Sequence, residues 1–386
     1  MPRLLMLPPT ETGPVIDPRD CELSRSLVED VTLTLCRSRL YDVVAPFTAQ
    51  QLLEREAGEH SISFDYIVRI SLVARDTPLP FSLLRIDIGD ARSGQSIHQG
   101  EMELRTGNLI GLHQGLSSVV VDRICGQIAR EELYRFRRTG AASAYVHYLL
   151  AMRRGDRADL PSLLLAQKSL ARSIQLAPDF VPALSELART KTLEWLERGS
   201  ADRALLREAT HLAERGHRYD PLDSSSLREI GHAALYQHDL ASALEHFDAA
   251  LELAPNHADL LVDQADVLTH MSRHVEAETL ITRALALNPL APDDYYWIGG
   301  AVSFFRERYQ EAIDRLTAMR SPGLALRLLA ASAAMNGDLE EARRYRDQVL
   351  ERDPSFTVAK WASLYPEPNR TDTAHYLQAL RMAGFS

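Results

Sequence analysis

The chain has 386 residues, of which 45% are hydrophobic and 25% are charged, as in an ordinary globular protein with room for two or three domains. A formal net charge of −10 argues against nucleic acid as a direct partner, because binding to phosphates needs a basic surface. No apolar run is long enough to span a membrane, and the first residues do not have the pattern of a signal peptide. With three scattered cysteines, these features predict a cytoplasmic protein.

The N-terminal part of the chain mixes strand patterns with helical ones. Strands are expected at residues 3–7, 41–47 and 64–74, and a hairpin is expected where residues 83–88 and 97–104 flank a turn with Gly89 and Gly94. Helices are expected at residues 21–39, 48–56 and 112–137, with Thr48 as the N-cap of the second. Together these elements predict a small α/β domain over residues 1–140.

This order of elements resembles the domain related to the N-terminal domain of TolB. The resemblance rests on the stretches PRLLMLPPTETG, ELSRSLVEDVTLTL and LRIDIGDARSGQSI, although the family usually has Leu-Pro-Phe where this chain has Leu7-Pro8-Pro9. In bacterial regulators such a domain directly precedes tetratricopeptide repeats. The arrangement is similar to the C-terminal half of rhizobial adenylate-cyclase-like proteins and of CadC-like winged-helix regulators. Since the first strand begins close to Met1, the effector domain of those regulators is expected to be absent or on a separate chain.

Residues 224–289 contain two copies of one pattern in register. The residues Gly231, Ala243, Phe247, Ala250 and Pro255 recur as Ala265, Ala277, Ile281, Ala284 and Pro289. Small residues where two helices cross, and a proline after the second helix, are the tetratricopeptide signature when they recur at this constant interval. Similar prolines at 178, 221, 322 and 354 extend the pattern to six repeats over residues 141–354, with capping helices over residues 355–386. The predicted fold is a small α/β domain followed by an all-α tetratricopeptide solenoid.

In these repeats the first helix of each unit is expected to line a concave groove. The expected partner-binding residues are Arg228, His232, Tyr236, Asp263, Asp266, His270, Tyr296 and Phe304. Carboxylates at groove positions, among them Asp259, Asp266 and Asp293, together with the aromatic residues favour a basic or amphipathic protein segment as the partner. An acidic face that contacts only water is the alternative. Asp263 and Asp266 stand where repeats that clamp chaperone tails need lysine and asparagine, so that activity is excluded.

The sequence contains no phosphate-binding glycine loop, no nucleophile elbow and no HExxH motif. Asp266, His270 and His274 are spaced by four, which on one helix would suit a divalent metal, but His274 is expected in a turn that breaks the shared face. Neighbouring carboxylates on repeat helices are usually solvated, so we assign no catalytic residue to them. No enzyme activity, cofactor or metal site is predicted.

The sequence therefore predicts a non-catalytic scaffold or regulator that binds a protein partner in the groove of its repeats. The alternative is the ligand-sensing regulatory half of a signalling or transcription regulator, whose winged-helix or adenylate-cyclase effector domain is absent or separate.

Overall fold

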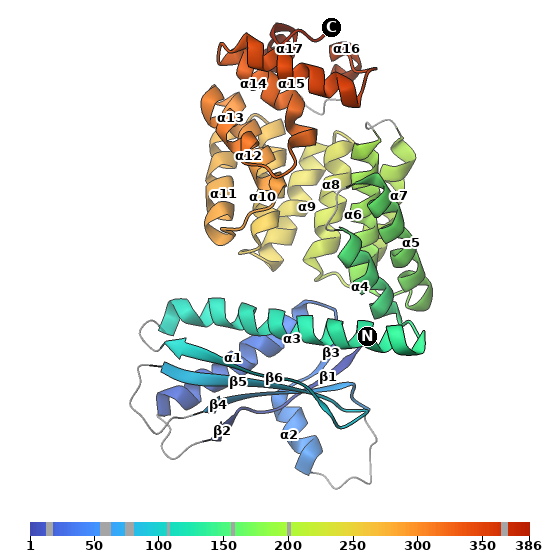
Figure 1. Ribbon diagram of the computed structural model, residues 1–386, viewed down its shortest axis with the longest axis vertical. Coiled ribbons are helices and arrows are strands. Elements are labelled where there is room, and N and C mark those ends of the chain that lie inside the picture. Colours follow the sequence, from blue (N-terminus) through green and yellow to red (C-terminus); the bar gives the residue numbers. More distant parts are fainter. Residues whose placement is uncertain are drawn as a thin grey trace. The chain divides into compact units, whose positions relative to one another are not determined.

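The computed structural model describes residues 1–12, 18–54, 63–73, 81–105, 109–155, 159–198, 202–363 and 370–386. The chain forms two compact units, Met1–Ala183 and Leu184–Ser386. The first contains a sheet and the second is helical (Figure 1). The predicted fold class, a small α/β region followed by a helical solenoid, is confirmed.

The sheet of the first unit has six strands among the described residues. They are β1 (Arg3–Met6), β2 (Thr10–Thr12), β3 (Asp42–Val44), β4 (Tyr66–Val73), β5 (Phe81–Asp90) and β6 (Ser96–Arg105). Their order is β3-β1-β4-β5-β6, and β2 also pairs with β4. The N-terminal strands pair in parallel, whereas β4, β5 and β6 are antiparallel. The predicted hairpin is β5–β6, and β2 is a strand that the sequence analysis missed.

Both faces of this sheet are partly covered by helices. They are α1 (Pro18–Arg37), α2 (Pro46–Glu54) and α3 (Leu109–Thr139), with α2 and α3 on opposite faces in Figure 1. Successive side chains of a strand point to opposite faces, so Leu5 and Leu7 pack with Ala49 of α2, whereas Leu4 lies buried on the other side. The prediction of Thr48 as an N-cap is wrong, because α2 already begins at Pro46, where a proline suits the first helical turn.

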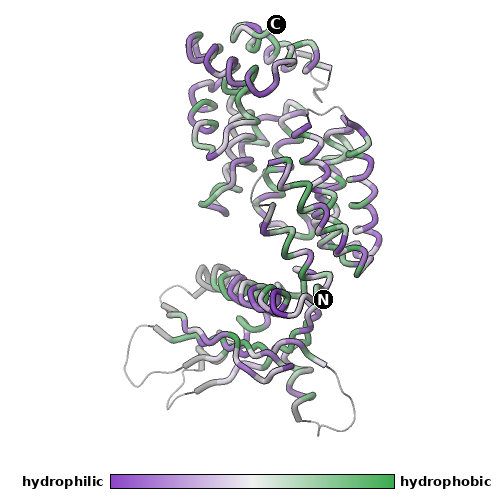
Figure 2. Tube along the Cα trace, turned by 45° about the vertical axis from the view of Figure 1, so that its right-hand side comes forward, coloured by the Kyte–Doolittle hydropathy of each residue, from purple (hydrophilic) through white to green (hydrophobic). Residues whose placement is uncertain are grey.

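The rest of the chain is helical. The helices are α4 (Ala144–Gly155), α5 (Leu160–Leu176), α6 (Val181–Glu197), α7 (Arg203–Tyr219), α8 (Ser224–Tyr236), α9 (Leu240–Leu253), α10 (Ala258–His270), α11 (His274–Leu287), α12 (Asp293–Phe305), α13 (Tyr309–Thr317), the short 3-10 helix η1 (Pro322–Ala325), α14 (Leu326–Met335), α15 (Leu339–Arg352), α16 (Val358–Ala362) and α17 (Arg370–Met382). Hydrophobic and hydrophilic residues alternate along them (Figure 2). No helix in the described part of the chain is long and apolar enough to cross a membrane.

The pairs α8–α9 and α10–α11 show how the repeat is built. Asp239 caps α9 by accepting a hydrogen bond from the Ser242 amide at 3.1 Å. A Cβ on Gly231 would lie 2.9 Å from the Phe247 ring, so glycine permits the close crossing of α8 and α9. The interval from α8 to α10 equals the interval from α9 to α11. It is also the interval between the two copies of the sequence pattern, so the predicted period is confirmed for these helices.

One extra residue in the loop before α12 shifts the following repeat. Residues 254–257 join α9 to α10, whereas residues 288–292 join α11 to α12. The shift is also seen at Gly300, which takes the place that Gly231 has in its own repeat. A Cβ on Gly300 would lie 2.6 Å from Leu316, just as a Cβ on Gly231 would meet Phe247. Each residue of α12 therefore faces the direction expected for the residue before it.

The C-terminal helix α17 packs on the last helical pair. Tyr376, Leu380 and Phe385 belong to one hydrophobic cluster with Leu329 of α14 and Ala342 of α15. Apolar faces of the final pair are thus covered by the tail of the same chain.

Candidate functional site

A cavity of about 550 Å³ opens in the helical unit, and its walls are unusually rich in aromatic side chains. We call it the aromatic groove, after its lining residues Trp195, Tyr236, Trp297, Phe305, Phe356, Trp361 and Tyr376. The chain has three tryptophans, and all of them lie here. Aromatic side chains offer large contact areas at a low entropic cost, which is why they are common in binding sites.

The groove is built mainly from the first helix of each pair. The described lining residues of the regular repeats come from α6, α8, α10, α12 and α14, and none comes from α7, α9, α11 or α13. The C-terminal segment adds Phe356, Trp361 and Tyr376. The expectation that first helices line the groove therefore agrees with the geometry.

Cationic side chains gather where α14, α15 and α16 close the groove. They are Arg327, Arg352 and Lys360, and none of them forms an ion pair with a described residue. The Arg327 guanidinium lies 5.6 Å from the ring centre of Phe356 and 5.8 Å from that of Trp361. These contacts hold the cation against the aromatic wall and leave its charge available to an anionic group.

A buried ionic cluster connects α8 with α10. We call Arg228, His232, Asp259 and Asp263 the Arg228 cluster. Arg228 Nε donates to Asp263 Oδ2 at 2.5 Å, and its NH1 lies 3.4 Å from Asp259 Oδ2. His232 Nε2 lies 3.3 Å from Asp263 Oδ1, and the Asp263 side chain is only 7% exposed. Two cationic groups thus share one buried carboxylate.

The electrostatics of the Arg228 cluster follow from this sharing. Burial by itself would raise the pKa of Asp263, but Arg228 and His232 outweigh it and hold the pKa well below its usual range. Burial opposes the charged form of His232 too, yet Asp263 raises its pKa. The charges within the Arg228 cluster therefore balance one another, and the cluster fixes the relative position of α8 and α10.

The structure divides the predicted partner-binding residues into three groups. Tyr236, Asp266 and His270 line the aromatic groove. Arg228, His232 and Asp263 form the Arg228 cluster instead and are largely buried. Phe304 and Tyr296 do not line the groove, and the prediction for Phe304 is wrong because its side chain is fully buried.

Phe304 is fully buried in the hydrophobic core, and Tyr296 packs against the hydrophobic clusters on both sides of α12. The one-residue shift of α12 is the physical reason, because it places Trp297 and Phe305 in the groove where Tyr296 and Phe304 were expected. Asp293 is displaced in the same way, since its carboxylate accepts hydrogen bonds from the Arg320 and Ser321 amides.

The sequence analysis missed most of the aromatic groove. Trp297 and Phe305 would have followed from recognising the longer loop before α12. Phe356, Trp361 and Tyr376 lie outside the regular repeats, so no repeat position assigns them to the groove.

The spacing of Asp266, His270 and His274 brings only the first two together, with His270 Nε2 at 3.5 Å from Asp266 Oδ1. His274 begins α11, its Nε2 lies 2.9 Å from Asp372 Oδ2, and its ring stacks on Phe305. Within the residues described, no group of three or more ligating side chains is arranged to hold a metal ion.

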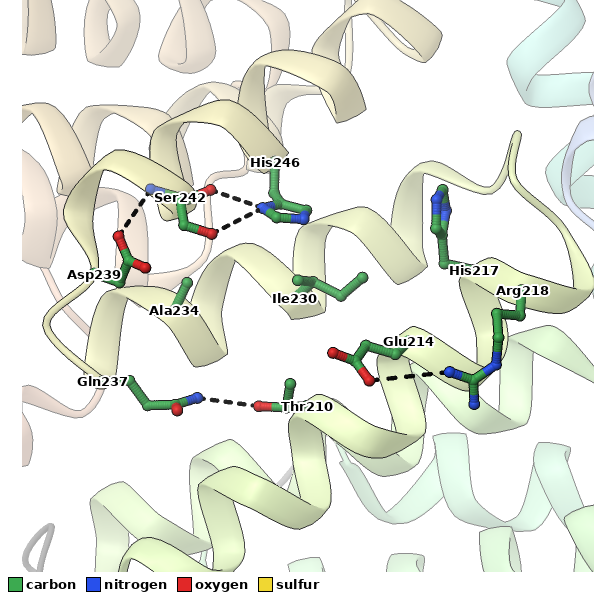
Figure 3. A pocket seen from close by; sticks show the side chains of 10 residues that line it. All are labelled: Thr210, Glu214, His217, Arg218, Ile230, Ala234, Gln237, Asp239, Ser242 and His246. Carbon is green, nitrogen blue, oxygen red and sulfur yellow. Dashed lines mark hydrogen bonds and ion pairs between the residues drawn. The ribbon is translucent and has the colours of Figure 1, made fainter.

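A second cavity, of about 590 Å³, lies among α7, α8 and α9 (Figure 3). Several of its polar side chains bond to their neighbours: Gln237 Nε2 donates to Thr210 Oγ1 at 3.1 Å, and His246 Nδ1 donates to the Ser242 carbonyl at 2.7 Å. The buried Nδ1 of His217 has no partner among the described residues. The cavity has few aromatic or apolar groups to hold a ligand, so the aromatic groove is the stronger candidate site.

Residues 234–297, which include parts of α8 and α12 and the helices between them, match the family model for the tetratricopeptide repeat. This segment of the chain therefore resembles tetratricopeptide repeats. Repeats of this kind generally mediate protein–protein interactions and are generally non-catalytic. The matched segment contributes Tyr236, Asp266, His270 and Trp297 to the aromatic groove.

No curated protein matches the sequence. Among solved structures, the repeat protein is similar to a thermophilic tetratricopeptide-repeat protein of Thermus thermophilus, at 20% identity and a TM-score of 0.40 over 54% of this chain and 100% of that one. It is also similar to PilF of Pseudomonas aeruginosa, at 16% identity and a TM-score of 0.39 over 55% of this chain and 93% of that one. Since these TM-scores lie below 0.5, neither likeness bears on the function of this chain.

Proposed function

We propose that this protein is a non-catalytic adaptor that binds a segment of another protein in the aromatic groove. The observation that supports the proposal is the gathering of all three tryptophans and four further aromatic side chains around one cavity on the first helices of the repeats. Such a wall suits the apolar face of a helix or of an extended chain. Trp297 and Trp361 are the anchors that we expect to contribute most of the binding energy.

The charges around the groove suggest the chemistry of the segment. Asp266, which pairs with His270, lines the groove on α10, whereas Arg327, Arg352 and Lys360 line its C-terminal part together with Asp353. An amphipathic segment with a basic residue at one end and an acidic residue at the other would complement both. Opposite charges at the two ends would also fix the direction in which the segment lies.

A ligand-sensing regulator is the second candidate. A cavity of about 550 Å³ with aromatic walls and a few charged groups falls within the usual size range of small-molecule sites, roughly 300–1,000 Å³. In that case residues 1–140 of the first unit, which we propose to be a TolB-N-like domain, would belong to a signalling or transcription regulator. A metabolite would then bind in the same groove, and its binding would be transmitted to a partner.

The test of the adaptor proposal is affinity purification with the tagged full-length chain from lysate of its source cells, read by mass spectrometry. Trp297→Ala removes an anchor from the groove. Leu290→Ala is the matched control, because Leu290 is 84% exposed in the same unit and does not line the groove. A protein captured by the wild type and the control but lost with Trp297→Ala supports the proposal. Equal capture by all three proteins would exclude the groove as the binding site.

A further inference from the structure

Two carboxylates on neighbouring first helices lack partners among the residues that the structure describes. Glu186 lies on α6 and Glu229 on α8, close enough for the charge of Glu229 to disfavour ionisation of Glu186. The Glu229 side chain is buried at 4% exposure, and no described group donates a hydrogen bond to its Oε2. Neither carboxylate joins an ion pair within the described ranges. Buried ionised groups without partners are rare because they are costly.

The nearby cations do not neutralise this pair. Arg228 is committed to Asp263 and Asp259, and His232 lies 3.3 Å from Asp263. Arg189, on α6, is the remaining described cation in the neighbourhood of the two glutamates. When both glutamates are ionised, they face one uncommitted guanidinium, and one negative charge is left uncompensated.

The pKa values of both glutamates are raised. Burial raises the pKa of Glu186 to about 7, with Glu229 adding to the effect and Arg189 and Arg228 opposing it. Burial also raises the pKa of Glu229. A further cation brought to this place would favour the ionised forms and relieve the penalty that the free protein carries.

Glu229 stands seven residues before Tyr236 on α8, so the two side chains lie on the same face of that helix, about two turns apart. Tyr236 lines the groove, and burial together with the charges of Asp266, Asp263 and Glu229 raises its pKa. Trp195 contacts the Tyr236 ring at 5.1 Å, and its buried Nε1 donates to no acceptor in the described part of the chain. A bound peptide that lies against these two rings could accept a hydrogen bond from Trp195 Nε1 with one of its carbonyl groups. One of its side chains could then extend toward Glu229.

We propose that Glu186 and Glu229 form a cation subsite that receives an arginine or lysine side chain of the protein segment bound in the aromatic groove. This inference rests on the proposed adaptor function. A metal ion is a poorer occupant, since no described group of three ligating side chains surrounds this place. The guanidinium or ammonium group of a peptide would bring the missing charge and several hydrogen-bond donors together.

The experiment is a selection of random peptides displayed on phage against the full-length protein. Wild type, Trp297→Ala and the double variant Glu186→Gln/Glu229→Gln are compared, with Glu245→Gln, an exposed glutamate on α9, as the matched control. We expect wild type and control to enrich peptides with aromatic or aliphatic residues and a fixed arginine or lysine. The double variant should keep the apolar preference and lose the basic one.

The outcomes separate the two proposals. Peptides that depend on Trp297 but show no basic preference, or a basic preference that the double variant keeps, would overturn the cation subsite and leave the adaptor function standing. No peptide that depends on Trp297 would overturn both. A tryptophan fluorescence change on titration with spermidine alone, with no peptide enriched, would mean a small-cation site and would also overturn the inference.

Two further readouts distinguish a ligand role from a structural one. The double variant should raise the melting temperature of the free protein by about 2–4 °C, because it removes uncompensated charge while it weakens binding. The affinity for a selected basic peptide should fall about tenfold from pH 8 to pH 6 as Glu186 is protonated, and Glu186→Gln should flatten this dependence. A lower melting temperature together with an unchanged pH profile would contradict the subsite.

Discussion

Replacing Arg228 by methionine should destabilise the helical unit strongly. The guanidinium is 11% exposed and bonds Asp263, which is 7% exposed, at 2.5 Å. Arg228→Met keeps most of the side-chain volume but leaves an ionised carboxylate buried with His232 as its one remaining ionic neighbour in the Arg228 cluster. Removing one partner of a buried pair typically costs about 3–5 kcal/mol. Because His232 remains, and because Asp259 is 34% exposed, we expect the lower end, about 3 kcal/mol.

The assay is urea unfolding followed by tryptophan fluorescence. All three tryptophans, Trp195, Trp297 and Trp361, belong to the second unit, so the signal reports that unit alone. In the wild type, Asp263 has a folded pKa below its unfolded value, so its stabilising contribution is present above the unfolded pKa and is lost as pH falls through the folded one. In Arg228→Met that depression shrinks, so the difference in unfolding free energy from the wild type should narrow as the pH falls below about 4.

The control is a double-mutant cycle with Asp263→Asn. If the pair is coupled as the structure shows, Arg228→Met in the Asp263→Asn background should cost at least ~2 kcal/mol less than in the wild type. A loss below ~1 kcal/mol for Arg228→Met alone, or additive losses in the cycle, would refute the account of the Arg228 cluster.

Two other predictions concern packing. Gly231→Ala should lower the stability of the second unit by about 1–3 kcal/mol, since its Cβ would meet the Phe247 ring at 2.9 Å, whereas Gly126→Ala on α3, with open space at its Cβ, should stabilise by about 0.5–1 kcal/mol. Thermal unfolding followed by circular dichroism checks both, and shifts of the same sign would contradict the reasoning. Phe304→Ala should lower the free energy of urea unfolding by about 3–5 kcal/mol and leave the affinity for a selected peptide unchanged. Trp297→Ala should do the reverse. A loss of affinity in Phe304→Ala would show that Phe304 contributes to the groove.

The sequence predicted those parts of the fold that depend on local patterns. The repeat period placed α8 to α11, because crossing helices require a small residue such as Gly231 and the chain turns after fixed helix lengths. Alternating residues in β5 and the glycine turn after it likewise predicted the β5–β6 hairpin, whereas the antiparallel pairing of β4 with β5 was not predicted.

The candidate site was less accessible to this reasoning, for two physical reasons. Counting one period forward ignored the longer loop before α12, and an error of one residue rotates every side chain of a helix by about 100°. That error put Phe304 in the groove and Trp297 outside it. The second reason is that Trp361 and Tyr376 reach the groove from an irregular tail, whose path depends on tertiary packing.

Hydrogen–deuterium exchange of the full-length protein, with and without a peptide selected on it, tests the central claim most directly. If the aromatic groove is the binding site, the peptide should slow exchange in α8, α10, α12 and α14, the helices that line it. Protection confined to the second helices, α9, α11 and α13, or to the sheet of the first unit, would show that binding occurs elsewhere and would contradict the account.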